Sequence, residues 1–99
     1  MNWLESHMEK HSVTVPSLAV AVAVCDRANA AAYKHANRVW PGRFSHGVFF
    51  DVEQIVTGGD VQHKVVPTSF EACHIAKKFD VLNDAVRYCG DTATNRSAE

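Results

Sequence analysis

The chain lacks a long hydrophobic run, since its most apolar stretch, Leu18 to Cys25, is far shorter than the roughly 20 residues of a membrane-spanning helix. Its first residues show no basic segment followed by an apolar one, the pattern of a secretory signal. The three cysteines, Cys25, Cys73 and Cys89, are odd in number and widely spaced, unlike the disulfide framework of a small secreted protein. We therefore expect a cytoplasmic protein with reduced thiols.

Motifs of catalysis and cofactor binding are also missing. The sequence has no Cys-x-x-Cys pair, no phosphate-binding glycine pattern and no serine nucleophile motif. His7 and His11 are four residues apart, but the glutamate between them is displaced from its place in the zinc-protease motif. We therefore expect no metal, no cofactor and no enzymatic activity.

The chain also has little net charge. The 99 residues carry a formal charge of -1, so no overall field draws the chain to nucleic acid or to an acidic membrane. Hydrophobic residues make up 46% of the sequence, enough for one globular domain rather than a disordered chain. We assign residues 1–90 to a single domain and residues 91–99 to a flexible polar tail.

Two long amphipathic helices are predicted. The first runs from Ser69 to Cys89, after a capping box that begins at Thr68, and ends at Gly90. The second runs from Ser17 to Val39, and one face of it carries the stripe Leu18, Val22, Cys25, Asn29, Ala32, Ala36 and Val39. A competing interpretation makes residues 18–24 a strand, because valines alternate there with period two.

A hairpin is predicted between these helices, with Gly58-Gly59 at the centre of its turn. Folding about the turn pairs Val56 with Val61, Gln54 with His63, and Val52 with Val65. A short helix from Trp3 to His11 completes an α+β fold with the order α-α-β-β-α. Two strands alone are marginal in water, so we expect the hairpin to pack on the helices, gain a third strand, or pair with a second copy in a homodimer.

The clearest functional signal is a charge asymmetry. No Asp or Glu occurs from Arg27 to Phe50, whereas four basic residues and several aromatic ones do. Basic groups beside aromatic rings suit an acidic protein surface or a nucleic acid. The competing interpretation is a solvated helix face with Trp40 and Phe44 in the core. The predicted partner-binding residues are Lys34, Arg38, Trp40, Arg43, Phe44 and His46.

These observations predict a non-catalytic binding protein, of the adaptor or inhibitor type that phages and mobile elements encode, which docks on an acidic protein surface. One alternative is a small enzyme or a ligand- or metal-binding protein with a site at a dimer interface, for which the candidates are His46, His63, Cys73 and His74. A nucleic-acid binder that uses the same basic window is the other alternative.

Overall fold

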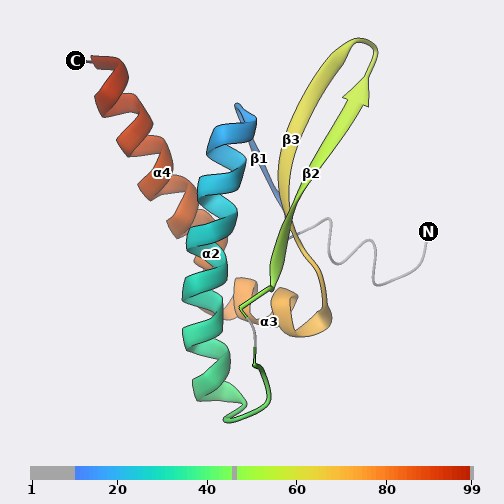
Figure 1. The fold of residues 1–99 in the computed structure, drawn as a ribbon, viewed down its shortest axis with the longest axis vertical. Helices are drawn as coiled ribbons and strands as arrows, with labels where there is room; N and C mark the ends of the chain where they lie inside the picture. Colours follow the sequence, from blue (N-terminus) through green and yellow to red (C-terminus); the bar gives the residue numbers. More distant parts are fainter. Residues whose placement is uncertain (1–10, 46, 99) are drawn as a thin grey trace.

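The computed structural model contains three helices and a three-stranded antiparallel sheet within the residues that it describes (Figure 1). These are residues 11–45 and 47–98, with side chains as far as residue 89. The elements are β1 (Val13–Val15), α2 (Leu18–Val39), β2 (Phe50–Thr57), β3 (Asp60–Pro67), α3 (Phe70–Phe79) and α4 (Val81–Ala98). The α+β class is confirmed. The predicted order α-α-β-β-α is wrong, because β1 precedes α2 and the last predicted helix is two helices. The helix predicted over Trp3–His11 lies outside the described residues, except for His11.

Residues 18–24 belong to helix α2, so the helix prediction is confirmed and the competing prediction of a strand is wrong. Ser17 caps its first turn, since the Ser17 hydroxyl accepts a hydrogen bond from the Val20 N–H at 3.2 Å. The helix ends at Val39, with Trp40 as its C-cap. The predicted stripe is buried at Cys25 and in the C-terminal half of the helix, but Leu18 and Val22 are almost half exposed.

The hairpin register is the one that the sequence predicts. Val56 pairs with Val61, Gln54 with His63, and Val52 with Val65. Gly58 and Gly59 have φ values of 55° and 90°, which suit the type I′ turn that matches the twist of a two-residue hairpin. Strand β1 adds to the far side of β3, so the sheet order is β1-β3-β2 and β2 is left as a long edge strand.

The helix predicted from Ser69 to Cys89 is interrupted at Asp80. Ser69 rather than Thr68 is its N-cap, with the Ser69 hydroxyl accepting from the Ala72 N–H at 3.2 Å. Asp80 has a left-handed φ of 53° and ends α3, and its carboxylate accepts a hydrogen bond from the Asn83 side chain at 2.8 Å. The helix end predicted at Gly90 is wrong as well, because α4 continues to Ala98.

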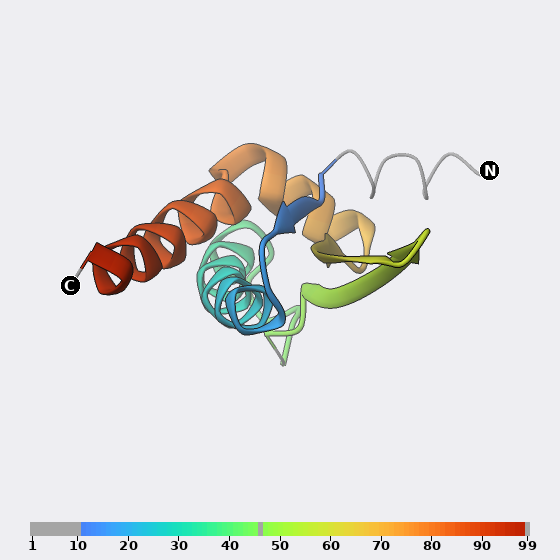
Figure 2. The same cartoon turned by 90° about the horizontal axis from the view of Figure 1, so that it is seen from above.

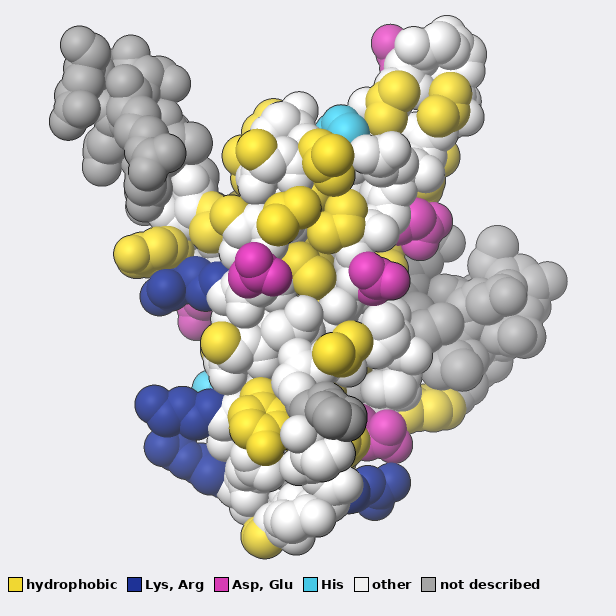
Figure 3. Space-filling view, viewed as in Figure 1, with side chains coloured by type: hydrophobic (Ala, Val, Ile, Leu, Met, Phe, Trp, Pro, Cys, Tyr) yellow, Lys and Arg dark blue, Asp and Glu magenta, His cyan; other side chains and the backbone are white. Residues whose placement is uncertain are grey.

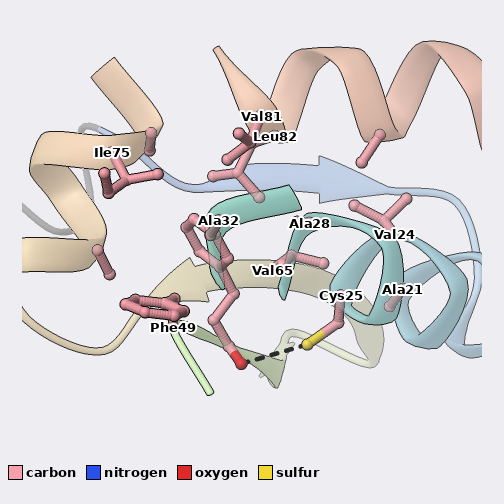
Figure 4. Packing of buried hydrophobic residues seen from close by; sticks show 14 of the residues in the cluster. Ala21, Val24, Cys25, Ala28, Ala32, Phe49, Val65, Ile75, Val81 and Leu82 are labelled. Carbon is pink, nitrogen blue, oxygen red and sulfur yellow. Dashed lines mark hydrogen bonds between the residues drawn. The ribbon is translucent and has the colours of Figure 1, made fainter. Parts of the chain in front are cut away.

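The core lies where α2 meets the sheet on one side and α4 on the other. Alanines at positions 21, 28, 32 and 36 of α2 are fully buried and let the neighbouring elements approach closely (Figure 4). Phe49, Phe50 and Ile75 are the largest side chains in this core. Figure 2 shows α2 and α4 side by side and the hairpin projecting away from both. Among the described residues, no helix is long and apolar enough to cross a membrane.

Candidate functional site

An aromatic cluster forms where α2 ends and the chain turns back toward β2. Trp40 contacts Phe44 edge-on, with ring centroids 5.8 Å apart, and Phe44 contacts the buried Phe49 at 5.0 Å. The His74 ring of α3 lies 5.5 Å from Trp40 on another side. Gly42 in this turn has a positive φ of 75°, which residues with a side chain adopt only at a cost in free energy. Trp40 and Phe44 are half-buried, so they belong to the edge of the core and also keep an exposed part.

Arg43 reaches over this cluster from the same turn. Its guanidinium carbon lies 6.0 Å from the Trp40 ring centre and 5.8 Å from the Phe44 ring centre, at the outer limit of cation–π attraction. Its other contact is a long ion pair of 3.7 Å with Glu71. The Arg43 side chain is exposed, so this pair adds little to stability. Arg43 is therefore held loosely enough to exchange Glu71 for another carboxylate.

Basic side chains from two helices lie around the cluster. Lys34 and Arg38 are exposed on α2 and, being four residues apart, lie on one side of it. Figure 3 shows Lys and Arg side chains gathered on one side of the lower half of the molecule. Helix α3 runs alongside, because His35 stacks on Phe79 at 3.9 Å and Trp40 contacts His74. We define the basic–aromatic surface as the predicted residues Lys34, Arg38, Trp40, Arg43 and Phe44, together with His74, Lys77 and Lys78 of α3. The predicted residue His46 lies outside the described residues.

The contribution of α3 was not predicted. Lys77 and Lys78 lie far from the basic window along the chain, and both are exposed. The signal that was available is the helical period, since Ala72, Ile75 and Ala76 face the core and leave the two lysines that follow them outside. What the period does not reveal is that this outer face lies beside the end of α2.

A hollow between α2 and α4 lies next to this surface. Its volume is about 300 Å³, and its lining residues are Arg27, Ala30, Ala31, His35, Phe79, Val81, Asp84 and Ala85. The His35 ring forms part of the wall, and its buried Nδ1 atom has no hydrogen-bond partner among the described residues. At the opposite end the Arg27 guanidinium lies 3.6 Å from the centre of the Tyr88 ring. The hollow thus has apolar walls and polar ends.

Of the candidates for an enzyme that the structure describes, Cys73 and His74 lie on α3 and His63 lies on β3, while His46 is outside the described residues. Cys73 is fully buried, and this burial raises the pKa of its thiol, which opposes the thiolate form that a nucleophile needs. His63 is half-buried on β3, and no hydrogen bond joins its Nδ1 atom to Gln54 or to any other described residue. Within the described part of the chain, no three His, Cys, Asp or Glu side chains are grouped as a metal site needs.

Asn29 is the most important polar residue that the sequence reasoning passed over. Its Oδ1 atom accepts hydrogen bonds from the backbone N–H groups of Phe49 and Phe50, both at 2.8 Å, and its Nδ2 atom donates to the Phe50 carbonyl at 3.3 Å. Cys25 donates to the same carbonyl at 3.3 Å. The Asn29 side-chain amide therefore makes hydrogen bonds with the backbone at the start of β2 that a neighbouring strand would otherwise make. One amide within an otherwise apolar stripe was the available signal.

Comparisons with family models, with curated proteins and with solved structures find no match for this chain. Its function is therefore inferred from its own residues.

Proposed function

We propose that this chain is a non-catalytic binding protein of the adaptor or inhibitor type, which docks on an acidic protein surface through the basic–aromatic surface. The observation that carries the proposal is the arrangement of exposed cations from α2 and α3 around one half-buried aromatic cluster. The acidic side chain of Glu71 contacts this surface through its ion pair with Arg43.

The arrangement has the composition of a protein interface. Interfaces are enriched in Trp, Phe and Arg at their centres and depleted there in acidic residues, and their rims are polar. Trp40 and Phe44 are held in place by ring contacts before any partner binds. Little side-chain entropy is then lost on docking, which favours binding through these rings.

The charges of the surface favour a protein partner over nucleic acid. Cations gathered on one face steer an acidic partner into register and speed association. The hairpin, by contrast, carries exposed acidic side chains at Asp51, Glu53 and Asp60, and the whole chain has a formal charge of -1. A long polyanion such as DNA would meet repulsion as it extended past the basic surface.

The cell compartment and biological setting are part of the same proposal. All three cysteines are free, and Cys25 and Cys73 are buried, which suits the reducing cytoplasm. Small accessory proteins of phages and mobile elements that bind and inhibit a host protein are the type that we have in mind.

The experiment is affinity capture from host lysate, with recovered proteins quantified by mass spectrometry. The test variant is Lys34→Glu/Arg38→Glu, which reverses two exposed cations and leaves the aromatic cluster unchanged. Arg43 is left in place, because its reversal would set a carboxylate against Glu71. The control is Arg87→Gln, which removes an exposed positive charge from α4 without setting a carboxylate against its ion-pair partner Asp84. One protein captured by the wild type and the control, but lost from the test variant, supports the proposal.

Two results would contradict it. The first is equal capture of the same partner by the test variant, which would remove these cations from the contact. The second is tight binding of a fluorescent DNA duplex with an affinity that falls steeply with salt, because that result would make the chain a nucleic-acid binder. Thermal unfolding of each variant shows whether a loss of capture reflects a loss of fold.

One observation favours the alternative of a small-ligand protein, namely the buried and unpartnered Nδ1 atom of His35 in the wall of the hollow. A ligand that donates a hydrogen bond to Nδ1 and carries a carboxylate toward Arg27 would fit the polar ends. A fragment screen by NMR tests this alternative. Shifts at Ala30, Ala31 and His35 that disappear in His35→Phe would support it, and an absence of binding fragments would remove it.

A further inference from the structure

Strand β2 is an edge strand with little of the usual protection against pairing. Such edges are commonly shielded by shortness, by proline, by charged side chains such as lysine, or by a bulge. β2 is eight residues long, contains no Pro or Lys, and pairs with β3 in an unbroken register, and its charged residues are Asp51 and Glu53. The opposite edge of the sheet differs, because β1 is three residues long and Pro16 follows it directly.

The backbone groups that face this open edge can be identified from the turn. In a two-residue hairpin, Thr57 and Asp60 form the hydrogen-bonded pair that flanks the turn, and bonding then alternates along the strand. Phe50, Val52, Gln54 and Val56 therefore direct their N–H and C=O groups away from β3. The contacts agree, since both groups of Phe50 bond to side chains of α2.

Helix α2 covers only the beginning of the edge. Asn29 and Cys25 occupy the edge groups of Phe50, and beyond them the Val52 N–H bonds to the carboxylate of its neighbour Asp51. The stripe on α2 that contains Asn29 and Cys25 continues at spacings of three and four residues to Val22 and Leu18, which are almost half exposed. Apolar side chains gather on this face, over the N-terminal half of α2 and the hairpin (Figure 3).

We propose that a second copy of this chain pairs with β2 along this edge. The two β2 strands run antiparallel about a two-fold axis at Gln54. This register places Gln54 opposite Gln54 of the partner subunit and Val52 opposite Val56 of the partner subunit. The Gln54 pair exchanges two hydrogen bonds directly, and the Val52–Val56 pairs do so once the Val52 N–H leaves the carboxylate of Asp51, so that the two sheets join into one continuous sheet.

Charge selects this register from its neighbours. With Gln54 at the centre, Glu53 faces Ile55 of the partner subunit. A shift that brings Val52 opposite Gln54 of the partner subunit would set the two Glu53 carboxylates opposite each other, which is unfavourable, and would direct Val56 at the edge of Phe50 that α2 already occupies. The opposite shift leaves Val52 facing the glycine turn. The strand is therefore complementary to itself in one register.

The test is the oligomeric state measured by sedimentation velocity over a range of concentrations. Gln54→Pro removes an N–H from the open edge but no hydrogen bond to β3, so the monomer fold is preserved. Val56→Lys places a charge at the dimer contact. Its matched control is Val48→Lys, because Val48 and Val56 are each 70% exposed and Val48 precedes the strand.

The wild type and Val48→Lys should form dimers. In Gln54→Pro and Val56→Lys the dimer Kd should rise by about tenfold or more, because each change removes or repels a central contact. Circular dichroism verifies that both variants remain folded. A wild type that stays monomeric at every concentration, or one that binds only an extended segment of another protein, overturns the proposal. Dimers that persist unchanged in both edge variants overturn it as well.

Discussion

Replacing Asn29 by alanine leaves two buried N–H groups without an acceptor. Phe49 and Phe50 are 2% and 1% exposed, so water does not replace the Asn29 oxygen easily. A buried donor left unpaired costs about 1–3 kcal/mol, which gives about 2–6 kcal/mol for the pair. The better helix propensity of alanine returns up to about 0.7 kcal/mol. Domains of this size are stable by only about 5–15 kcal/mol, so the variant should be severely destabilised.

The measurement is urea unfolding followed by circular dichroism and tryptophan fluorescence, with the midpoint and slope compared with those of the wild type. Asn37→Ala is the matched control, because it makes the same change on the same helix at a residue whose side chain makes no hydrogen bond to the described residues. It should alter the free energy of unfolding by less than about 0.5 kcal/mol.

A second variant separates the acceptor from the donor. Asn29→Asp keeps an oxygen for the two N–H groups and loses the Nδ2 donor to the Phe50 carbonyl and to the Cys25 sulfur. It should therefore retain more stability than Asn29→Ala. A loss below about 1 kcal/mol for Asn29→Ala would refute the reasoning, because it would mean that the N–H groups find other partners.

Four further predictions rest on single residues. Asp80→Val should lose about 1–2 kcal/mol in thermal or urea unfolding, whereas Asp80→Gly should be tolerated, because only the valine is strained at φ 53°. Burial raises the pKa of the Cys25 and Cys73 thiols, so the folded state retains these protons. The free energy of unfolding should therefore decline as the pH rises above about 8.5. Half-buried Cys89 should react first with a thiol reagent, as peptide mapping would show. Arg43→Ala should change stability by less than about 1 kcal/mol, measured in urea, because its ion pair is exposed.

The hairpin was predictable because its information is local. Gly58 and Gly59 allow the positive φ angles of one turn type, and alternation on either side then determines each partner. Helix α2 was predictable for a similar reason, since Ser17 supplies a cap and the residues before Pro41 end it.

The interruption at Asp80 was not visible in the apolar pattern. Ile75 and Leu82 are both buried, so the hydrophobic period passes through the break without a change of phase. The local signal was the aspartate itself. Asp tolerates the left-handed conformation and caps a following helix, and here it accepts a hydrogen bond from Asn83. An aspartate in the middle of a long predicted helix can therefore mark the end of one helix and the start of the next.

The candidate site was predicted in part for a related reason. Trp40, Arg43 and Phe44 are neighbours in the chain, and their proximity follows from one turn. His74 and Lys77 join them only through the packing of α3 on α2, which depends on contacts between distant segments. Sequence reasoning found the part of the surface that is contiguous and missed the part that tertiary structure adds.

The departure of α2 from its predicted burial bears directly on the proposed dimer. The stripe from Leu18 to Asn29 is continuous in sequence, but only Cys25 and Asn29 meet β2, because the hairpin turns away from the helix beyond Phe50 (Figure 1). Val22 and Leu18 are left exposed, and among the described residues the edge of β2 beyond Phe50 has no partner strand. In the proposed dimer, β2 of the second copy would pair these backbone groups. The exposed first half of the stripe is then an apolar face that the dimer would have available to cover.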